Sequence, residues 1–104
     1  MKKILVITTA MALSAAAYAG DPAAGKEKSK LCATCHGENG VSQAPDFPKL
    51  AGQHNDYLVR ALKDYQSGAR RNPIMAGQDA NLKPRDIEDI AAYYSSQQAL
   101  VSKY

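Results

Sequence analysis

Apolar residues recur at helical spacing in two segments of the chain, and a third segment is rich in helix-forming residues. In residues 55–67 the apolar face consists of Tyr57, Leu58, Ala61, Leu62 and Tyr65. After Pro84 the apolar face consists of Ile87, Ile90, Ala91 and Tyr94. Residues 23–35 form the third segment, with lysines along one side. Because no stretch alternates apolar and polar residues as a strand would, the pattern predicts an all-α fold with three main helices.

Residues with known end preferences mark where these helices begin and end. Asp21 followed by Pro22 predicts the N-cap and the first position of the first helix, which we expect to end near His36. Gly68 stands where the C-terminal cap of the second helix belongs. Pro84 opens the third helix, because proline is tolerated at the first helical position.

Two segments between the helices lack sustained periodicity. Residues 37–53 contain three glycines together with Pro45 and Pro48, so we expect an ordered loop that wraps one edge of a bound group. Residues 69–83 contain Pro73 and are also expected to be irregular.

The start of the chain has the pattern of a secretory signal peptide. Two lysines follow the first methionine, a mostly apolar run extends to position 17, and small residues frame positions 17–19. A permanent membrane anchor is the alternative, but it needs about 20 apolar residues, which is more than this run provides. We therefore expect residues 1–19 to be cleaved before Gly20, leaving residues 20–104 as one exported domain.

The charge balance gives no sign of a nucleic-acid partner. The full chain has 13 Lys and Arg against 10 Asp and Glu, a formal net charge of +3 at pH 7. Two of the lysines lie in the expected signal peptide, so the remaining domain is close to neutral. A domain of this size buries only a marginal core by itself, and a large apolar cofactor would stabilise it.

The motif Cys32-Ala33-Thr34-Cys35-His36 has the spacing that covalent haem attachment requires. On a helix, Cys32, Cys35 and His36 fall at positions i, i+3 and i+4 and share one face. The two thiols can then add to the two haem vinyl groups, and the neutral imidazole can bind the iron. The motif therefore predicts one covalently bound haem c.

Three other uses of the two cysteines compete with this interpretation. A structural zinc site needs four ligands, and beyond the motif the domain offers only His54 and carboxylates. A thioredoxin-like dithiol would follow a β-strand, and none is predicted before Cys32. A structural disulfide across so short a loop would restrict the unfolded chain very little.

The second axial ligand of the iron has two candidates in the expected domain, Met75 and His54. Met75 follows the cysteines at a distance that lets it approach the opposite face of the haem. Its thioether sulfur would favour Fe(II) and raise the reduction potential. His54 stands at the expected start of a helix, where polar residues are more often caps or exposed neighbours. We therefore expect His36 and Met75 as axial ligands, which leaves a six-coordinate iron with no position for a substrate.

Arg70 is a candidate for binding the haem propionates. It precedes the expected ligand Met75 together with Arg71, and a guanidinium group suits carboxylates. The alternative is that both arginines are solvated surface charges.

Beyond the haem motif, ordered segments of the chain resemble the small class I c-type cytochromes of bacterial periplasms. The resemblance is close to the cytochrome c553 type and to a single half of the two-haem cytochrome c4. The matching segments span nearly the whole expected domain and are Cys32-Ala33-Thr34-Cys35-His36-Gly37, Pro48-Lys49-Leu50-Ala51-Gly52-Gln53, Tyr65-Gln66-Ser67-Gly68-Ala69-Arg70, Asn72-Pro73-Ile74-Met75 and Asp89-Ile90-Ala91-Ala92-Tyr93-Tyr94. A single haem motif excludes a complete two-haem protein of the cytochrome c4 kind.

The resemblance implies a cytochrome c fold in which the N- and C-terminal helices cross. It implies His36 as the proximal ligand and Met75 as the distal ligand. It also implies that the backbone carbonyl of Pro48 accepts the proton of the proximal imidazole, which would fix the tautomer of that ring. Pro84 replaces the serine or threonine usual before the last helix, which affects capping more than chemistry.

Together these observations predict an electron carrier and not an enzyme. We expect the protein to pass single electrons between membrane or periplasmic redox proteins, as a monomer or weak dimer with no small-molecule substrate. The alternatives are a haem subunit of an oxidoreductase complex and a five-coordinate haem protein that binds a gas or reacts with peroxide.

Overall fold

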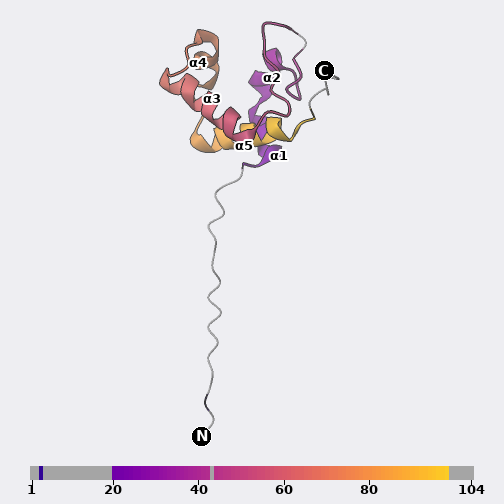
Figure 1. The fold of residues 1–104 in the computed structure, drawn as a ribbon, viewed down its shortest axis with the longest axis vertical. Coiled ribbons are helices and arrows are strands. Elements are labelled where there is room, and N and C mark those ends of the chain that lie inside the picture. The colour runs from indigo at the N-terminus through magenta and orange to yellow at the C-terminus, as the bar shows by residue number, and fades with distance from the viewer. Residues whose placement is uncertain (1–2, 4–19, 43, 99–104) are drawn as a thin grey trace.

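The structure, a computed structural model, describes residues 3, 20–42 and 44–98, so the expected signal peptide lies outside the described residues except for Lys3. The described residues form five helices and no strand: α1 (Pro22–Lys28), α2 (Lys30–His36), α3 (Asn55–Ser67), α4 (Pro73–Asp79) and α5 (Pro84–Ser96) (Figure 1). This arrangement confirms the expected all-α class. In this part of the chain no helix is both long and apolar enough to span a bilayer.

The core of the fold lies along α5. The stripe expected on this helix is fully buried, with Ile87, Ile90, Ala91 and Tyr94 each at most 2% exposed. Leu58 of α3 packs against this stripe, and α4 packs in turn on α3. The helix α3 begins and ends where the sequence predicts, and Gly68 adopts the left-handed conformation at its C-terminus.

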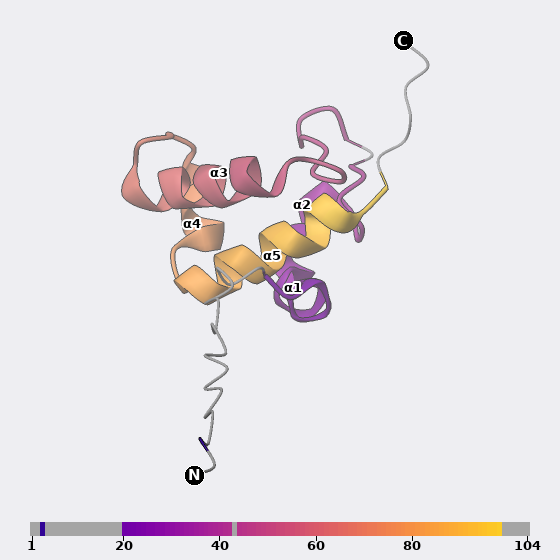
Figure 2. The ribbon, with the colours of Figure 1, turned by 60° about the horizontal axis from the view of Figure 1, so that its bottom comes forward.

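The first helix crosses α5 at Gly25, as the resemblance implies for the N- and C-terminal helices. A Cβ atom at Gly25 would lie 1.9 Å from the carbonyl oxygen of Asp89 and 2.8 Å from Cβ of Tyr93. Only glycine therefore permits so close an approach. Figure 2 shows α1 passing beneath α5, and Lys28 Nζ joins the two helices through Asp89 Oδ2 at 2.6 Å.

The single helix expected over residues 23–35 is divided at Ser29, where the backbone leaves the helical conformation (φ −96°, ψ 11°). The Ser29 hydroxyl donates to the carbonyl of Lys26 at 3.0 Å, a local bond of the kind that bends helices. Backbone hydrogen bonds from Ser29 to Gly25 and from Ala33 to Ser29 continue across this point. The division is therefore a kink, and it gives α2 its own direction.

The expectation that residues 69–83 are irregular is wrong, because α4 occupies Pro73–Asp79. The side chain of Asn72 accepts hydrogen bonds from the backbone N–H groups of Ile74 at 3.0 Å and Met75 at 3.2 Å. Pro73 stands at the first helical position, where its missing N–H costs nothing. The expected loop over residues 37–53 contains no helix in its described part.

Candidate haem site

The helix α2 carries both cysteines and the histidine of the motif. Cys32 and Cys35 are half-buried free thiols, and His36 is only 6% exposed. Burial raises the pKa of the Cys32 thiol, so its neutral S–H form dominates. Addition of an S–H bond across a vinyl double bond gives a thioether without any oxidant. These thiols therefore suit covalent attachment to a vinyl-bearing porphyrin.

A hydrogen bond fixes the tautomer of His36. Its Nδ1 atom lies 2.7 Å from the carbonyl oxygen of Pro48. Because a carbonyl only accepts hydrogen bonds, Nδ1 carries the proton and Nε2 keeps its lone pair. Phe47 also packs edge-on against the imidazole, with ring centroids 6.4 Å apart. Nε2 is therefore the atom of His36 that is able to bind iron.

The loop after α2 returns to the histidine because glycines allow its turns. Gly37 ends α2 with φ +85°, and a Cβ there would lie 2.3 Å from the carbonyl oxygen of Val41. Gly40 also has positive φ, and its carbonyl accepts a hydrogen bond from the Leu50 N–H at 2.8 Å. This closure brings Pro48 back beside His36.

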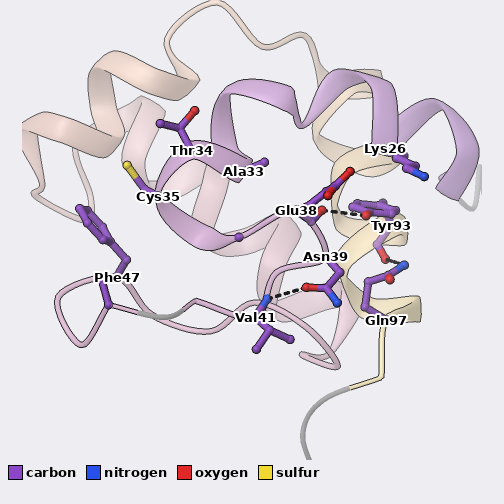
Figure 3. Close-up of a pocket in the computed structure, with 12 residues that line it drawn as sticks. Lys26, Ala33, Thr34, Cys35, Glu38, Asn39, Val41, Phe47, Tyr93 and Gln97 are labelled. Atoms are coloured by element: carbon purple, nitrogen blue, oxygen red, sulfur yellow. Dashed lines mark hydrogen bonds between the residues drawn. The ribbon is translucent and has the colours of Figure 1, made fainter.

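A surface groove of about 640 Å³ runs from the end of α2 toward α5 (Figure 3). Cys35 and Phe47 line one end, and Tyr93 and Gln97 line the other. The Tyr93 hydroxyl donates to the carbonyl of Glu38 at 2.8 Å, which ties the loop to α5. The groove therefore keeps the Cys35 end of α2 accessible on one side.

Met75 lies in the first turns of α4 and is half-buried. The Met75 backbone N–H donates to the Asn72 side chain, so the backbone that carries the Met75 sulfur is held at the start of α4. In Figure 2, α4 lies near the beginning of α5, whereas α2 lies toward its second half. His36 and Met75 therefore come from two different helices, α2 and α4.

Arg70 is exposed and lies just after α3, beyond its C-cap Gly68. Its guanidinium carbon lies 5.0 Å from the ring centroid of Tyr65, and its Nη1 atom donates to the Tyr57 hydroxyl at 3.2 Å. Both tyrosines belong to α3, so these contacts hold the arginine against that helix and not against α2. His54 is exposed at the N-cap of α3, and its side chain makes no capping hydrogen bond.

The donor set fits haem better than the competing cofactors. Within residues 20–42 and 44–98, no three or more His, Cys, Asp or Glu side chains gather as a metal site, so zinc lacks a ligand set there. Residues 20–31, the described stretch directly before Cys32, contain no strand of the kind that a thioredoxin-like dithiol would follow. Leu31 beside Cys32 and Ile74 beside Met75 are 72% and 63% exposed, so apolar surface is available next to both residues. Two free thiols, one buried imidazole and this surface together suit a porphyrin.

Two residues that shape the site were not predicted from the sequence. Asn72 caps α4, and the pair Asn72-Pro73 has the same N-cap and proline signature as the start of α1, so a signal was present. Phe47 contacts His36 across a loop, and no local pattern marks such a contact.

The fold and donor set define an all-α domain equipped for covalent haem attachment. Residues 22–98 match the family model for cytochrome c, and the chain belongs to the cytochrome c family. Haem c is therefore the expected cofactor, and the family implies electron transfer by a c-type haem. The resemblance to class I c-type cytochromes is confirmed.

Several known proteins are similar to this chain. Cytochrome c4 of Pseudomonas aeruginosa is 45% identical over 103 residues, which are 97% of this chain and 51% of that protein. Cytochrome c-554(548) of Halomonas halodenitrificans is 45% identical over 83 residues, covering 77% of this chain and 100% of that protein. A thiosulfate dehydrogenase electron acceptor of Thiomonas intermedia is 36% identical over 96 residues, 91% of this chain and 44% of that protein.

The solved structure of reduced cytochrome c4 from Pseudomonas stutzeri matches with a TM-score of 0.76 and 44% identity. The match covers 80% of this chain and 48% of that chain. This chain therefore spans about half the length of its cytochrome c4 relatives.

Proposed function

We propose that the protein is a periplasmic electron carrier whose single haem is ligated by His36 and Met75. The observation that carries this proposal is the 2.7 Å contact between His36 Nδ1 and the Pro48 carbonyl. It places the proton of the neutral imidazole on Nδ1, so that Nε2 carries the lone pair, on a residue that follows the two free thiols in the chain. Export with removal of residues 1–19 is part of the same proposal.

Each residue has a distinct task in this proposal. Cys32 and Cys35 would hold the haem through thioethers, and the Pro48 carbonyl orients the His36 imidazole. Met75 supplies the second axial ligand from α4, and Arg70 is the candidate partner for a propionate. When bound, the haem iron supplies the one-electron couple. With His36 and Met75 both bound to the iron, no position on the metal would remain for water or a substrate.

The first test is the absorption spectrum of the purified protein, oxidised and reduced. Reduced c-type bands together with the weak far-red band of methionine sulfur on ferric haem support the proposal. Met75→Ala should abolish the far-red band, lower the reduction potential and let carbon monoxide bind the reduced protein. His54→Ala is the matched control and should change none of these. An unchanged band or potential in Met75→Ala would rule out this ligand.

A haem subunit of an oxidoreductase complex is the second candidate. It is supported by the relative that is named as the electron acceptor of a thiosulfate dehydrogenase. Stoichiometric copurification of a partner at high salt would favour this candidate over a free carrier. Rapid carbon monoxide binding by the reduced native protein would instead favour a five-coordinate haem protein.

A further inference from the structure

The backbone that precedes α1 is seated on α5. A Cβ atom at Gly20 would lie 1.9 Å from the carbonyl oxygen of Glu88 and 2.9 Å from the backbone nitrogen of Asp89. No residue other than glycine fits in this position without a shift of one segment. The next residue makes a specific contact, because the Asp21 N–H donates to Asp89 Oδ1 at 2.8 Å. Residues 20 and 21 therefore belong to the packed structure.

The place where Gly20 lies is acidic. Asp89 is 1% exposed, and its Oδ2 atom accepts a 2.6 Å bond from Lys28 Nζ. Asp86 Oδ1 shares the same ammonium group at 3.0 Å, and the two carboxylates raise the pKa of Lys28. Three carboxylates, Asp21, Asp86 and Asp89, lie at this end of the α1–α5 contact, and the cations that act on Asp86 are Lys28 and Lys83. One further positive charge would therefore reduce an excess of negative charge.

Cleavage after Ala19 would deliver that charge. Hydrolysis of the Ala19–Gly20 peptide bond by a signal peptidase consumes one water, leaves a carboxylate on Ala19 and frees the amino group of Gly20. In unfolded chains such an α-amino group has a pKa of about 7.7–8.0, so it is mostly protonated at neutral pH. The uncleaved chain has an uncharged amide nitrogen at this position.

We propose that the processed N-terminus is a structural ligand: the α-ammonium group of Gly20 binds the buried carboxylate of Asp89 on α5. Signal-peptide removal then completes the α1–α5 packing in addition to releasing the protein. This inference rests on the cleavage site given in the proposed function, but not on the axial ligands of the haem.

The first experiment uses the haem-loaded protein purified after export. Its intact mass identifies the first residue, and NMR titration gives the pKa of the α-amino group. We expect a first residue of Gly20 and a pKa raised by about one unit, equivalent to a tenfold higher proton affinity in the folded state. A mature chain that starts elsewhere, or an α-amino group with its ordinary pKa, overturns the proposal.

The second experiment inserts one glycine between Ala19 and Gly20, so that the ammonium group moves one residue away while Gly20 and Asp21 are retained. The inserted variant should have a lower thermal midpoint than the native protein. In an Asp89→Asn background the loss on insertion should shrink, whereas in a background of Glu27→Gln, which changes an exposed carboxylate on α1, the loss should persist. Because a raised pKa stabilises below the unfolded value, the loss should disappear as the pH rises above the folded value. Equal midpoints at neutral pH would contradict the proposal.

Discussion

Asp79 has a buried carboxyl group that no hydrogen bond within the described residues stabilises. It is 1% exposed, and in the described part of the chain neither carboxylate oxygen has a hydrogen-bond partner. The contacts of this residue go through its backbone, whose carbonyl accepts from Gln66 Nε2 at 2.8 Å and from the Leu82 N–H at 3.0 Å. Burial accordingly raises the pKa of the Asp79 carboxyl.

Replacing this carboxyl by a neutral group of the same shape should stabilise the protein. For Asp79→Asn we expect the free energy of unfolding of the haem-loaded protein at pH 7 to rise by about 1 kcal/mol, because no charge is then buried unpaired. Urea unfolding followed by circular dichroism measures this difference. Asp46→Asn, at an exposed position, is the control and should change little.

The pH dependence of this difference has a defined sign. The folded pKa of Asp79 is raised above its ordinary value of 3.8, so the unfolded chain ionises at lower pH than the folded chain. The destabilisation is therefore absent below pH 3.8 and grows as the pH rises toward the folded pKa. Native and Asp79→Asn proteins should consequently converge in stability at acidic pH, and a difference that instead widened there would contradict this assignment.

Among the helices, local sequence predicts some and not others. The periodic helices α3 and α5 are long, pack one face on the core and have marked ends, so their sequences predict them. The seven residues of α4 are too few to show a period. The kink at Ser29 depends on a serine whose side chain bonds back to Lys26, within a segment where every residue tolerates a helix.

In the candidate haem site as well, local spacing can be predicted from the sequence and long-range contacts cannot. The spacing of Cys32, Cys35 and His36 is local, so the sequence alone places these groups on one helix face. The contact of Pro48 with His36 needs closure of a long loop, and only the resemblance to a family implied it. The contacts of Arg70 with two tyrosines join side chains of different segments, and no sequence pattern predicts them.

The crossing of α1 and α5 should be highly sensitive to side-chain size. Gly25→Ala places a Cβ within 1.9 Å of the Asp89 carbonyl, which forces the helices apart. We expect a loss of about 3 kcal/mol in the free energy of unfolding. Gly77→Ala in α4 is the control, because no heavy atom lies within 4 Å and its φ is not positive. That variant should be neutral or slightly more stable, since alanine favours helix.

Capping of α4 should affect the haem ligand as well as stability. Asn72→Ala removes the acceptor for the N–H groups of Ile74 and Met75, which should cost about 1 kcal/mol. Because Met75 is held in this turn, the far-red band of the ferric protein should disappear at a lower temperature than in the native protein. Asn72→Asp restores a capping oxygen and should recover most of the loss. A band that melts at the native temperature in Asn72→Ala would show that the cap does not hold the ligand.

At the scale of the whole molecule, the core is concentrated on one helix. Among the described residues the buried apolar side chains are Ala51, Leu58, Ile87, Ile90, Ala91, Ala92, Tyr93 and Tyr94, and all but two belong to α5. The helices of the haem site contribute no apolar residue to this set: His36 is the buried residue of α2, and Asp79 is that of α4. Burial of apolar side chains in the protein core therefore holds α2 and α4 less firmly than it holds α5.

The haem should supply this missing contact, so the haem-free chain should lose its fixed tertiary structure. We expect the Cys32→Ala, Cys35→Ala double variant, freed of haem, to lack near-ultraviolet circular dichroism and a cooperative thermal transition. Thr34→Ala changes an exposed residue within the same motif, keeps both thiols and should retain the native transition. A cooperative, native-like melt of the haem-free chain would mean that α5 and its neighbours suffice to order α2 and α4. Loss of the transition would show that the cofactor is part of the hydrophobic core, as expected for a domain of this size.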